Sequence, residues 1–419
     1  MDDNKKGIKI ILWVLSITAF IQMRPYFVWM TYSNGKMSWL IKASLYVSAL
    51  LITVFLIVSH RKINTTTMVT VTFLIVVQMY MLMIGIDNTS FLAVGNYIIL
   101  IVMIGFFFIT EHDRMEVFNK FANIFALSLV SGLIVFILTH LNFQPPYQIL
   151  QTDHAGKISM GVYYQKYFGS VFLYSPYDTF IRLNAMYDEA GVVGTFSALF
   201  LIADDLRFKG RLRNIIILIG GILSFSMAFY VIIIIGLVIK SFNMGLFKFS
   251  IALIVILLVF QGLMTVKTDN VIIKDVFQKR FKVVNGAVVG DNRANESFNY
   301  AFNEFIHGDL SKVLTGYGAN ASENNPLMYG SYVYKMLIYD YGIIGFIMLL
   351  GWIIYASIRT VGFDKRCIVL LIAFLLSIYQ RPYVLTIPYI FLLFGGYANL
   401  KNTGNENKKG QNKFEKTCK

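Results

Sequence analysis

Residues 214–240 read NIIILIGGILSFSMAFYVIIIIGLVIK, and this stretch decides how the chain is folded. Almost every residue in it is apolar, so it could form one tilted membrane-spanning helix. Gly220, Gly221 and the polar Ser224-Phe225-Ser226 interrupt the run near its middle. We therefore predict two short helices, 214–224 and 227–240, which meet near the membrane surface.

The whole chain has the composition of a membrane protein. Of its 419 residues 57% are hydrophobic and 14% are charged, and the mean hydropathy is +0.63. Soluble domains carry about 25% charged residues, so a soluble enzyme and a disordered chain are excluded. Two cysteines do not indicate a disulfide framework. The apolar runs are too long and uninterrupted for an outer-membrane barrel.

Apolar runs of spanning length recur from one end of the chain to the other. They lie at 8–23, 39–58, 68–86, 91–110, 118–141, 190–204, 214–224, 227–240, 250–266, 331–357, 367–380 and 384–400. This pattern predicts an all-α polytopic membrane protein with about 12 transmembrane helices. We expect residues 1–419 to form a single integral membrane domain.

The net charge of +14 indicates membrane orientation rather than nucleic-acid binding. Short segments on one side of the predicted bundle hold most of the lysines and arginines, including Arg207, Arg211 and Arg213 and the basic tail at 401–419. The positive-inside rule makes that side cytoplasmic, with both termini inside. The opposite side receives two long loops, 142–189 and 267–330, in which we expect short amphipathic helices. Long ordered loops are usually functional, so the working half should face outward.

The first long loop ends in polar residues at the mouth of a helix. Arg182 offers a planar fork of donors that matches a phosphate, and the alternative is an interfacial anchor. Glu189 can be an ordinary partner of the helix dipole. Tyr187 belongs to a group of tyrosines suited either to stacking on sugar rings or to the membrane interface.

The second long loop contains an amphipathic helix near 291–307. Its polar face lies within about 80° of arc and its phenylalanines lie opposite. The polar residues are Arg293, Glu296, Tyr300, Glu304 and His307, and the phenylalanines are Phe298, Phe302 and Phe305. A simple surface helix supported by pairs three residues apart is the alternative. Arg280 lies upstream in a basic cluster that could meet an anionic headgroup, and Arg381 lies at the outer edge of the last hairpin.

Metal and nucleotide motifs are missing from the sequence. No His, Cys and Asp cluster has zinc spacing, and there is no P-loop or GxGxxG fingerprint, so we expect no metal and no cofactor. Asp204-Asp205 resembles half of an acidic metal motif, but its cytoplasmic position favours a solvated helix end.

Several stretches resemble one family. They are 182–194, Ser224-Phe225-Ser226, the region from Arg293 to Gly316-Tyr317-Gly318, and 331–345. Their order and spacing over roughly 180–380 resemble the O-antigen polymerase (Wzy-type) family of the O-antigen ligase and polymerase superfamily.

The resemblance implies a GT-C-like, metal-independent, inverting glycosyltransferase in a bacterial cytoplasmic (inner) membrane. Its donor and acceptor would be oligosaccharides linked to undecaprenyl diphosphate, and a chain-length regulator would be a further partner besides the membrane lipid. Arg182 and Arg293 match the outer-loop arginines that contact the lipid diphosphate. The base stays open among Glu189, Glu296, His307, Asp188 and Glu304, and the substrate-binding candidates are Arg280, Arg381, Tyr187, Tyr300 and Tyr332.

Two alternatives remain at this stage. Ser331 stands where ligases tend to carry a histidine, which makes an O-antigen ligase the weaker interpretation. A flippase or transporter for the same lipid would need polar groups throughout its spans, whereas most charges here lie at the ends.

Overall fold

The computed structural model describes most of the chain, and 76% of the described residues are helical. The described residues are 2–29, 38–59, 64–84, 94–151, 161–175, 180–242, 245–266, 268, 270, 273–278, 283–284, 287–288, 296–328, 333–362, 364–382 and 384–417.

Each apolar run predicted as a span contains a helix in the described part of the chain. These helices are α1 (Asp2–Gln22), α3 (Ser38–Ser59), α4 (Thr65–Met83), α6 (Val94–Phe108), α7 (Glu111–His140), α9 (Ala190–Ala203), α10 (Leu212–Leu223), α11 (Met227–Phe242), α12 (Leu246–Thr265), α16 (Lys335–Val361), α17 (Lys365–Gln380) and α18 (Ile387–Thr417). The prediction began one of them at 118, but α7 begins at Glu111 because the Thr110 side chain accepts from the Asp113 backbone and caps the helix. The basic tail continues α18 as a helix.

Among the described residues, four helical stretches are long and apolar enough to cross a membrane. These are Leu40–Ile57, Thr65–Met83, Glu111–His140 and Lys335–Thr360. Other apolar helices are shorter, such as Ala190–Ala203 and Leu212–Leu223. The helical membrane architecture follows from these spans, and the number of twelve remains a prediction.

The two-helix prediction for residues 214–240 is confirmed. α10 ends at Leu223 and α11 begins at Met227, and between them Phe225 has φ +46°, which no continuous helix permits. The Ser224 hydroxyl donates to the Gly221 carbonyl and accepts from the Ser226 amide, so it satisfies backbone groups at the break. A Cβ on Gly194 would lie 2.3 Å from that of Ser226, so α9 packs directly on this connection.

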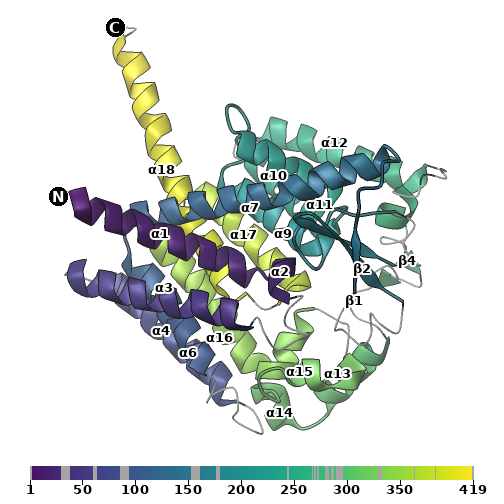
Figure 1. The fold of residues 1–419 in the computed structure, drawn as a ribbon, viewed down its shortest axis with the longest axis horizontal. Coiled ribbons are helices and arrows are strands. Elements are labelled where there is room, and N and C mark those ends of the chain that lie inside the picture. The colour runs from purple at the N-terminus through teal and green to yellow at the C-terminus, as the bar shows by residue number, and fades with distance from the viewer. Residues whose placement is uncertain are drawn as a thin grey trace.

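α7 is the central helix of the bundle and packs against α1, α10 and α18. Its Phe121 and Phe125 lie 5.1 Å and 5.0 Å from the ring of Phe200 on α9, within an aromatic core. Figure 1 shows that α1 begins and α18 ends on the same side of the molecule. The first antiparallel sheet and α13 (Glu296–His307) lie on the opposite side.

The first long loop contains an antiparallel sheet, so the all-α prediction is wrong for this part of the chain. Its strands are β1 (Gln148–Gln151), β2 (Tyr163–Tyr167) and β3 (Ser170–Tyr174), in the order β1-β2-β3. Tyr163 pairs with Tyr174 and Tyr167 with Ser170. Aromatic residues favour strands, and Gly169 adopts the φ of +71° that the tight turn requires.

The second long loop carries the predicted amphipathic helix, now α13. Phe298 is fully buried, Phe305 is buried and Phe302 packs against them, while Tyr300 is 60% exposed. The predicted division of the two faces is therefore confirmed. Short helices follow it, namely α14 (Leu310–Thr315), α15 (Ala321–Asn324) and η2 (Pro326–Met328). The remaining short elements are α2 (Tyr26–Trp29), η1 (Ile273–Gln278) and the pair β4 (Val283–Val284) and β5 (Ala287–Val288).

Two glycines join this layer to α16. Gly316 has φ +83°, and Gly342, at which α16 is kinked, has φ +69°. A Cβ on Gly316 would lie 2.3 Å from the Asp340 carbonyl oxygen, and one on Gly342 would lie 2.1 Å from that of Leu314. The buried Asp340 carboxylate accepts from the Ser322 amide at 2.7 Å and from its hydroxyl at 3.1 Å. The outward helices are thus fixed to the start of a long membrane helix.

Candidate functional site

The end of the first long loop, residues 180–189, folds back into the bundle instead of lying on its surface. Backbone hydrogen bonds join it to the end of α10 (Leu183 N to Leu223 O, 3.0 Å) and to β3 (Val171 N to Ala185 O, 2.7 Å). A Cβ on Gly132 of α7 would lie 2.7 Å from the Cα of Ala185. Residue 132 lies eight residues before the end of α7, a rise of about 12 Å. The segment therefore lies well inside the outward end of α7.

Tyr187 is a core residue, which corrects its predicted role in stacking on sugars. Its ring is fully buried and packs 5.9 Å from the ring of Phe125. Its hydroxyl forms a 2.9 Å hydrogen bond with that of Ser128 on α7. A ring enclosed in this way offers no face to a substrate, so Tyr187 anchors the returning segment.

Glu189 and Arg381 form an ion pair between two helix ends. Glu189 immediately precedes α9 and Arg381 immediately follows α17. The Arg381 Nη2 atom lies 3.0 Å from Glu189 Oε2, and the side chains are 22% and 29% exposed. Burial acts most strongly to lower the pKa of Arg381, but the negative charge of Glu189 and smaller contributions outweigh it and leave the pKa raised. The sequence selected both residues but gave no sign that they meet.

Arg182 lies on the same returning segment as Glu189, seven residues before it. Its guanidinium lies over the ring of Phe180, 5.6 Å from the centroid. The Phe180 ring in turn packs edge-on against Phe225 in the break between α10 and α11, with centroids 5.3 Å apart. The break predicted from sequence therefore supports the loop that carries Arg182.

Three buried donors in this region have no hydrogen-bond partner among the described residues. They are the Nε atoms of Arg182 and Arg381 and the hydroxyl of Tyr389 on α18. Tyr389 packs 4.8 Å from the ring of Phe196 on α9 and lies within the electrostatic field of Arg381. Buried polar groups are nearly always hydrogen-bonded, so such donors suit a ligand rich in acceptor oxygens. The sequence analysis missed Tyr389 because a tyrosine in an apolar run carries no local signal.

The candidates on α13 form a separate group. Glu296 begins the helix, and the exposed Tyr300 hydroxyl donates to Glu304 at 2.6 Å, which raises the pKa of Tyr300. The exposed His307 donates from Nδ1 to the Asn303 carbonyl at 2.9 Å. Figure 1 shows α13 apart from α9. Arg280, Arg293 and Tyr332 lie outside the described residues.

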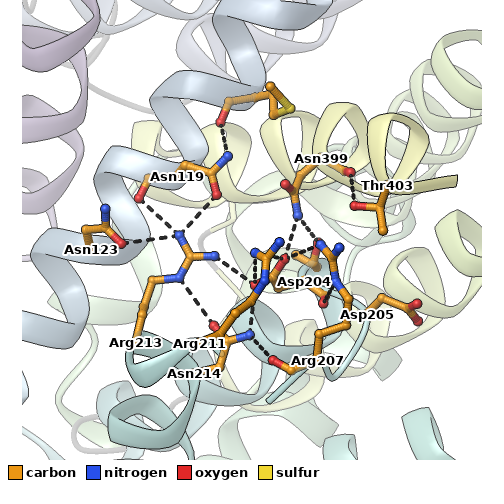
Figure 2. Close-up of polar contacts among 12 residues, drawn as sticks. Asn119, Asn123, Asp204, Asp205, Arg207, Arg211, Arg213, Asn214, Asn399 and Thr403 are labelled. Atoms are coloured by element: carbon orange, nitrogen blue, oxygen red, sulfur yellow. Dashed lines mark hydrogen bonds and ion pairs between the residues drawn. The ribbon is translucent and has the colours of Figure 1, made fainter. Parts of the chain in front are cut away.

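At the other end of α9, Asp204 corrects the prediction of a solvated helix end. Its side chain is only 1% exposed, and three arginines of the predicted cytoplasmic side surround it (Figure 2). Arg207 Nη2, Arg211 Nη1 and Arg213 Nη2 lie 2.7 Å, 2.9 Å and 2.8 Å from its oxygens. Asn214 and Asn399 donate to the same carboxylate at 2.7 Å and 3.0 Å. We call these six residues the Asp204 cluster.

The Asp204 cluster ties four helices together. Arg213 and Asn214 come from α10 and Asn399 from α18, while Arg213 also donates to Asn119 and Asn123 on α7 (Figure 2). Burial acts most strongly to raise the pKa of Asp204, but Arg213, Asn214, Asn399 and Arg207 together hold it at about 2. Each carboxylate oxygen already has several donors, so the cluster is a structural lock.

Neither a metal site nor a known related protein adds to the description of this site. Among the described residues no group of three or more His, Cys, Asp or Glu side chains could hold a metal ion. Comparison of the chain with protein-family models, curated proteins and solved structures found no match.

Proposed function

We propose that this protein is a membrane-embedded glycosyltransferase that polymerises lipid-linked repeat units of a surface polysaccharide. It would transfer the growing glycan from undecaprenyl diphosphate to the sugar of a new lipid-linked repeat. The reaction would take place at the periplasmic face of a bacterial cytoplasmic membrane, with both termini in the cytoplasm. The resemblance to the O-antigen polymerases suggests the reaction, and the contacts of Arg182 and Arg381 support it.

One observation carries the proposal. Arg381 pairs with Glu189 at the start of α9, Tyr389 lies in the electrostatic field of Arg381, and Arg182 lies on the segment that leads into Glu189. Each of Arg381, Tyr389 and Arg182 has a buried donor with no partner among the described residues. Arginine presents a fixed fork of donors that matches phosphate oxygens. A lipid diphosphate supplies several such oxygens, so it fits the donors that the described residues leave unused.

The chemistry requires charge stabilisation and a base. The bond between the anomeric carbon and the diphosphate oxygen breaks, and that carbon bonds to the acceptor hydroxyl oxygen, whose proton passes to a base. Undecaprenyl diphosphate leaves with increased negative charge, and preorganised arginine donors stabilise such charge. Glu189 holds Arg381, so we assign it a positioning role. The base is not assigned, because His307 lies on α13, apart from α9 and this ion pair.

The test compares arginine variants in vesicles that contain the lipid-linked repeat unit. Removing one such donor typically lowers the rate about 10²–10³-fold. We therefore expect Arg381→Ala and Arg182→Ala to lose long polymer and the lysine versions to recover only part of it, because lysine is a point charge. Arg359→Lys is the matched control, since Arg359 is an exposed arginine in the last turn of α16.

The readout is a polysaccharide ladder on a gel, normalised to folded protein in size-exclusion chromatography. Full-length ladders from folded alanine variants at both Arg182 and Arg381 would contradict the proposal. Glu189→Gln separates the roles, because a positioning residue should slow polymerisation less than Arg381→Ala does.

A further inference from the structure

The turn between β2 and β3 presents an aromatic side chain with almost no protein contact. The Phe168 side chain is 98% exposed. Phe168 and Gly169 connect Tyr167 to Ser170. Single exposed apolar side chains are common, whereas a contiguous exposed apolar surface marks contact with a partner or a membrane.

This turn is fixed against α7 by a direct contact. The Ser131 hydroxyl of α7 donates to the Gly169 carbonyl. A Cβ on Gly169 would lie 3.2 Å from the Cβ of Ser131, so the turn rests on the helix surface. The position of Phe168 along α7 is therefore known: it lies at the level of Ser131.

Ser131 belongs to an exposed apolar face of α7. At 100° per residue, Leu127, Ser131, Ile134 and Leu141 fall within about 80° of one another. Leu127 is 72% exposed, Ile134 54% and Leu141 71%. Leu141 lies ten residues beyond Ser131, a rise of about 15 Å. Exposed apolar side chains thus continue on both sides of the hairpin turn along the helix axis.

We infer that the hairpin turn is a membrane anchor, with Phe168 inserted among the lipid acyl chains of the leaflet on the sheet side. α7 is one of the helices long and apolar enough to span a membrane, so its exposed apolar face lies against lipid. The turn rests on that face, between Leu127 and Leu141, and shares its surroundings. Backbone carbonyls in hydrocarbon must be satisfied by protein, and Ser131 does this for Gly169.

The anchor is connected to the candidate site through the backbone. Val171, in the strand that follows the turn, donates to the carbonyl of Ala185. Ala185 lies between Arg182 and Glu189 in the returning segment. The lipid contact of Phe168 therefore helps to fix the depth of that segment in the bilayer, whatever reaction the site performs.

Spin labels can measure the depth of the turn. In a Cys367→Ala, Cys418→Ser background, Phe168→Cys is labelled with a nitroxide in lipid vesicles. Collisions with oxygen, which concentrates in lipid, are compared with collisions with a water-soluble nickel chelate. Ile134→Cys on α7 is the lipid-facing control, and Gln148→Cys at the exposed start of β1 is the water-facing control.

We expect the label at residue 168 to collide more with oxygen than with nickel, as at residue 134 and in contrast to residue 148. Since Phe168 contacts little protein, Phe168→Cys should fold normally and elute as wild type. A nickel collision rate equal to that at residue 148 would overturn the inference. Low collision with both reagents and an immobilised spectrum would also overturn it, because the turn would then be covered by protein, such as a second copy of this chain.

Discussion

Replacing Asp204 by asparagine should destabilise the protein more than replacing any other Asp or Glu among the described residues by its amide. The substitution keeps the size of the side chain but removes its charge and replaces one acceptor oxygen by an NH2 donor. Arg207, Arg211 and Arg213 would then face one another with no counter-charge between them. We expect α9, α10 and α18 to separate at this end of the bundle.

The magnitude follows from burial and distance. Asp204 is 1% exposed, and Arg213, its least exposed charged partner, is 14% exposed. Two unit charges 4 Å apart interact by about 4 kcal/mol at an effective dielectric constant of about 20. Removing one partner of a buried ion pair typically costs about 3–5 kcal/mol, because the other charges stay buried and uncompensated. We therefore expect Asp204→Asn to lower the free energy of unfolding by about 3–5 kcal/mol.

The neighbouring residue supplies the control. Asp205 also pairs with a cation, Lys240 at 2.9 Å, but the two side chains are 20% and 39% exposed. Partly exposed pairs contribute about 0–1 kcal/mol, so Asp205→Asn should have little effect. The assay is reversible unfolding of the purified protein in mixed micelles with increasing sodium dodecyl sulfate.

A difference of less than about 1 kcal/mol between the Asp204→Asn and Asp205→Asn free energies would refute the structural lock. The pH dependence gives a second check. The pKa of Asp204 falls from 3.8 to about 2 on folding, so its stabilisation is complete above pH 3.8 and is lost as the pH falls through 2. This shift corresponds to about 2 kcal/mol, and the variant should not show that loss.

Four further outcomes are expected. Gly316→Ala should abolish folded protein, because its Cβ would lie 2.3 Å from a carbonyl oxygen. Gly362→Ala has open space around it and should lower the free energy of unfolding by only about 1–2 kcal/mol. The yield of folded protein in size-exclusion chromatography distinguishes the two variants. Phe298→Ala, at a fully buried site, should cost about 3–5 kcal/mol and open α13 to limited proteolysis. In intact spheroplasts, Asn325→Cys should react with an impermeant reagent and Gly210→Cys should not, and the reverse would invert the orientation. Polymer formation should survive EDTA, and loss restored by magnesium would contradict a metal-independent transfer.

The helices were predictable because each depends on local sequence. Apolar runs bounded by polar residues mark the spans, and Gly220, Gly221 and the serines marked the break between α10 and α11. The division of α13 into a phenylalanine face and a polar face followed from helical periodicity alone. Helix ends differ where a cap lies beyond the apolar run, as Thr110 does.

The failures involve contacts that a single residue does not reveal, and most of these contacts join distant segments. The tyrosines of the first long loop were interpreted as sugar-stacking or interfacial residues, although those of β2 pair with β3 across a hairpin. From the sequence, Asp204 was predicted to be a solvated helix end. Asn399, which donates to its carboxylate, is 195 residues away in the chain and is brought there by the fold. Arg381 and Glu189 are 192 residues apart, so no spacing rule could pair them.

The two ends of α9 show why the proposed site belongs beside Glu189 and not beside Asp204. Both ends carry buried arginines and a carboxylate. At Asp204 the three guanidinium groups and two amides all donate to one carboxylate, so a substrate would have to displace existing bonds. Beside Glu189, Arg381 uses Nη2 for the carboxylate, while its Nε and that of Arg182 have no partner among the described residues. A carboxylate whose oxygens all have donors stabilises the fold, whereas an ion-paired arginine with an unused N–H donor can still bind a ligand. Substitution at Asp204 should therefore lower stability first, and Arg381→Lys should lower activity while leaving stability nearly unchanged.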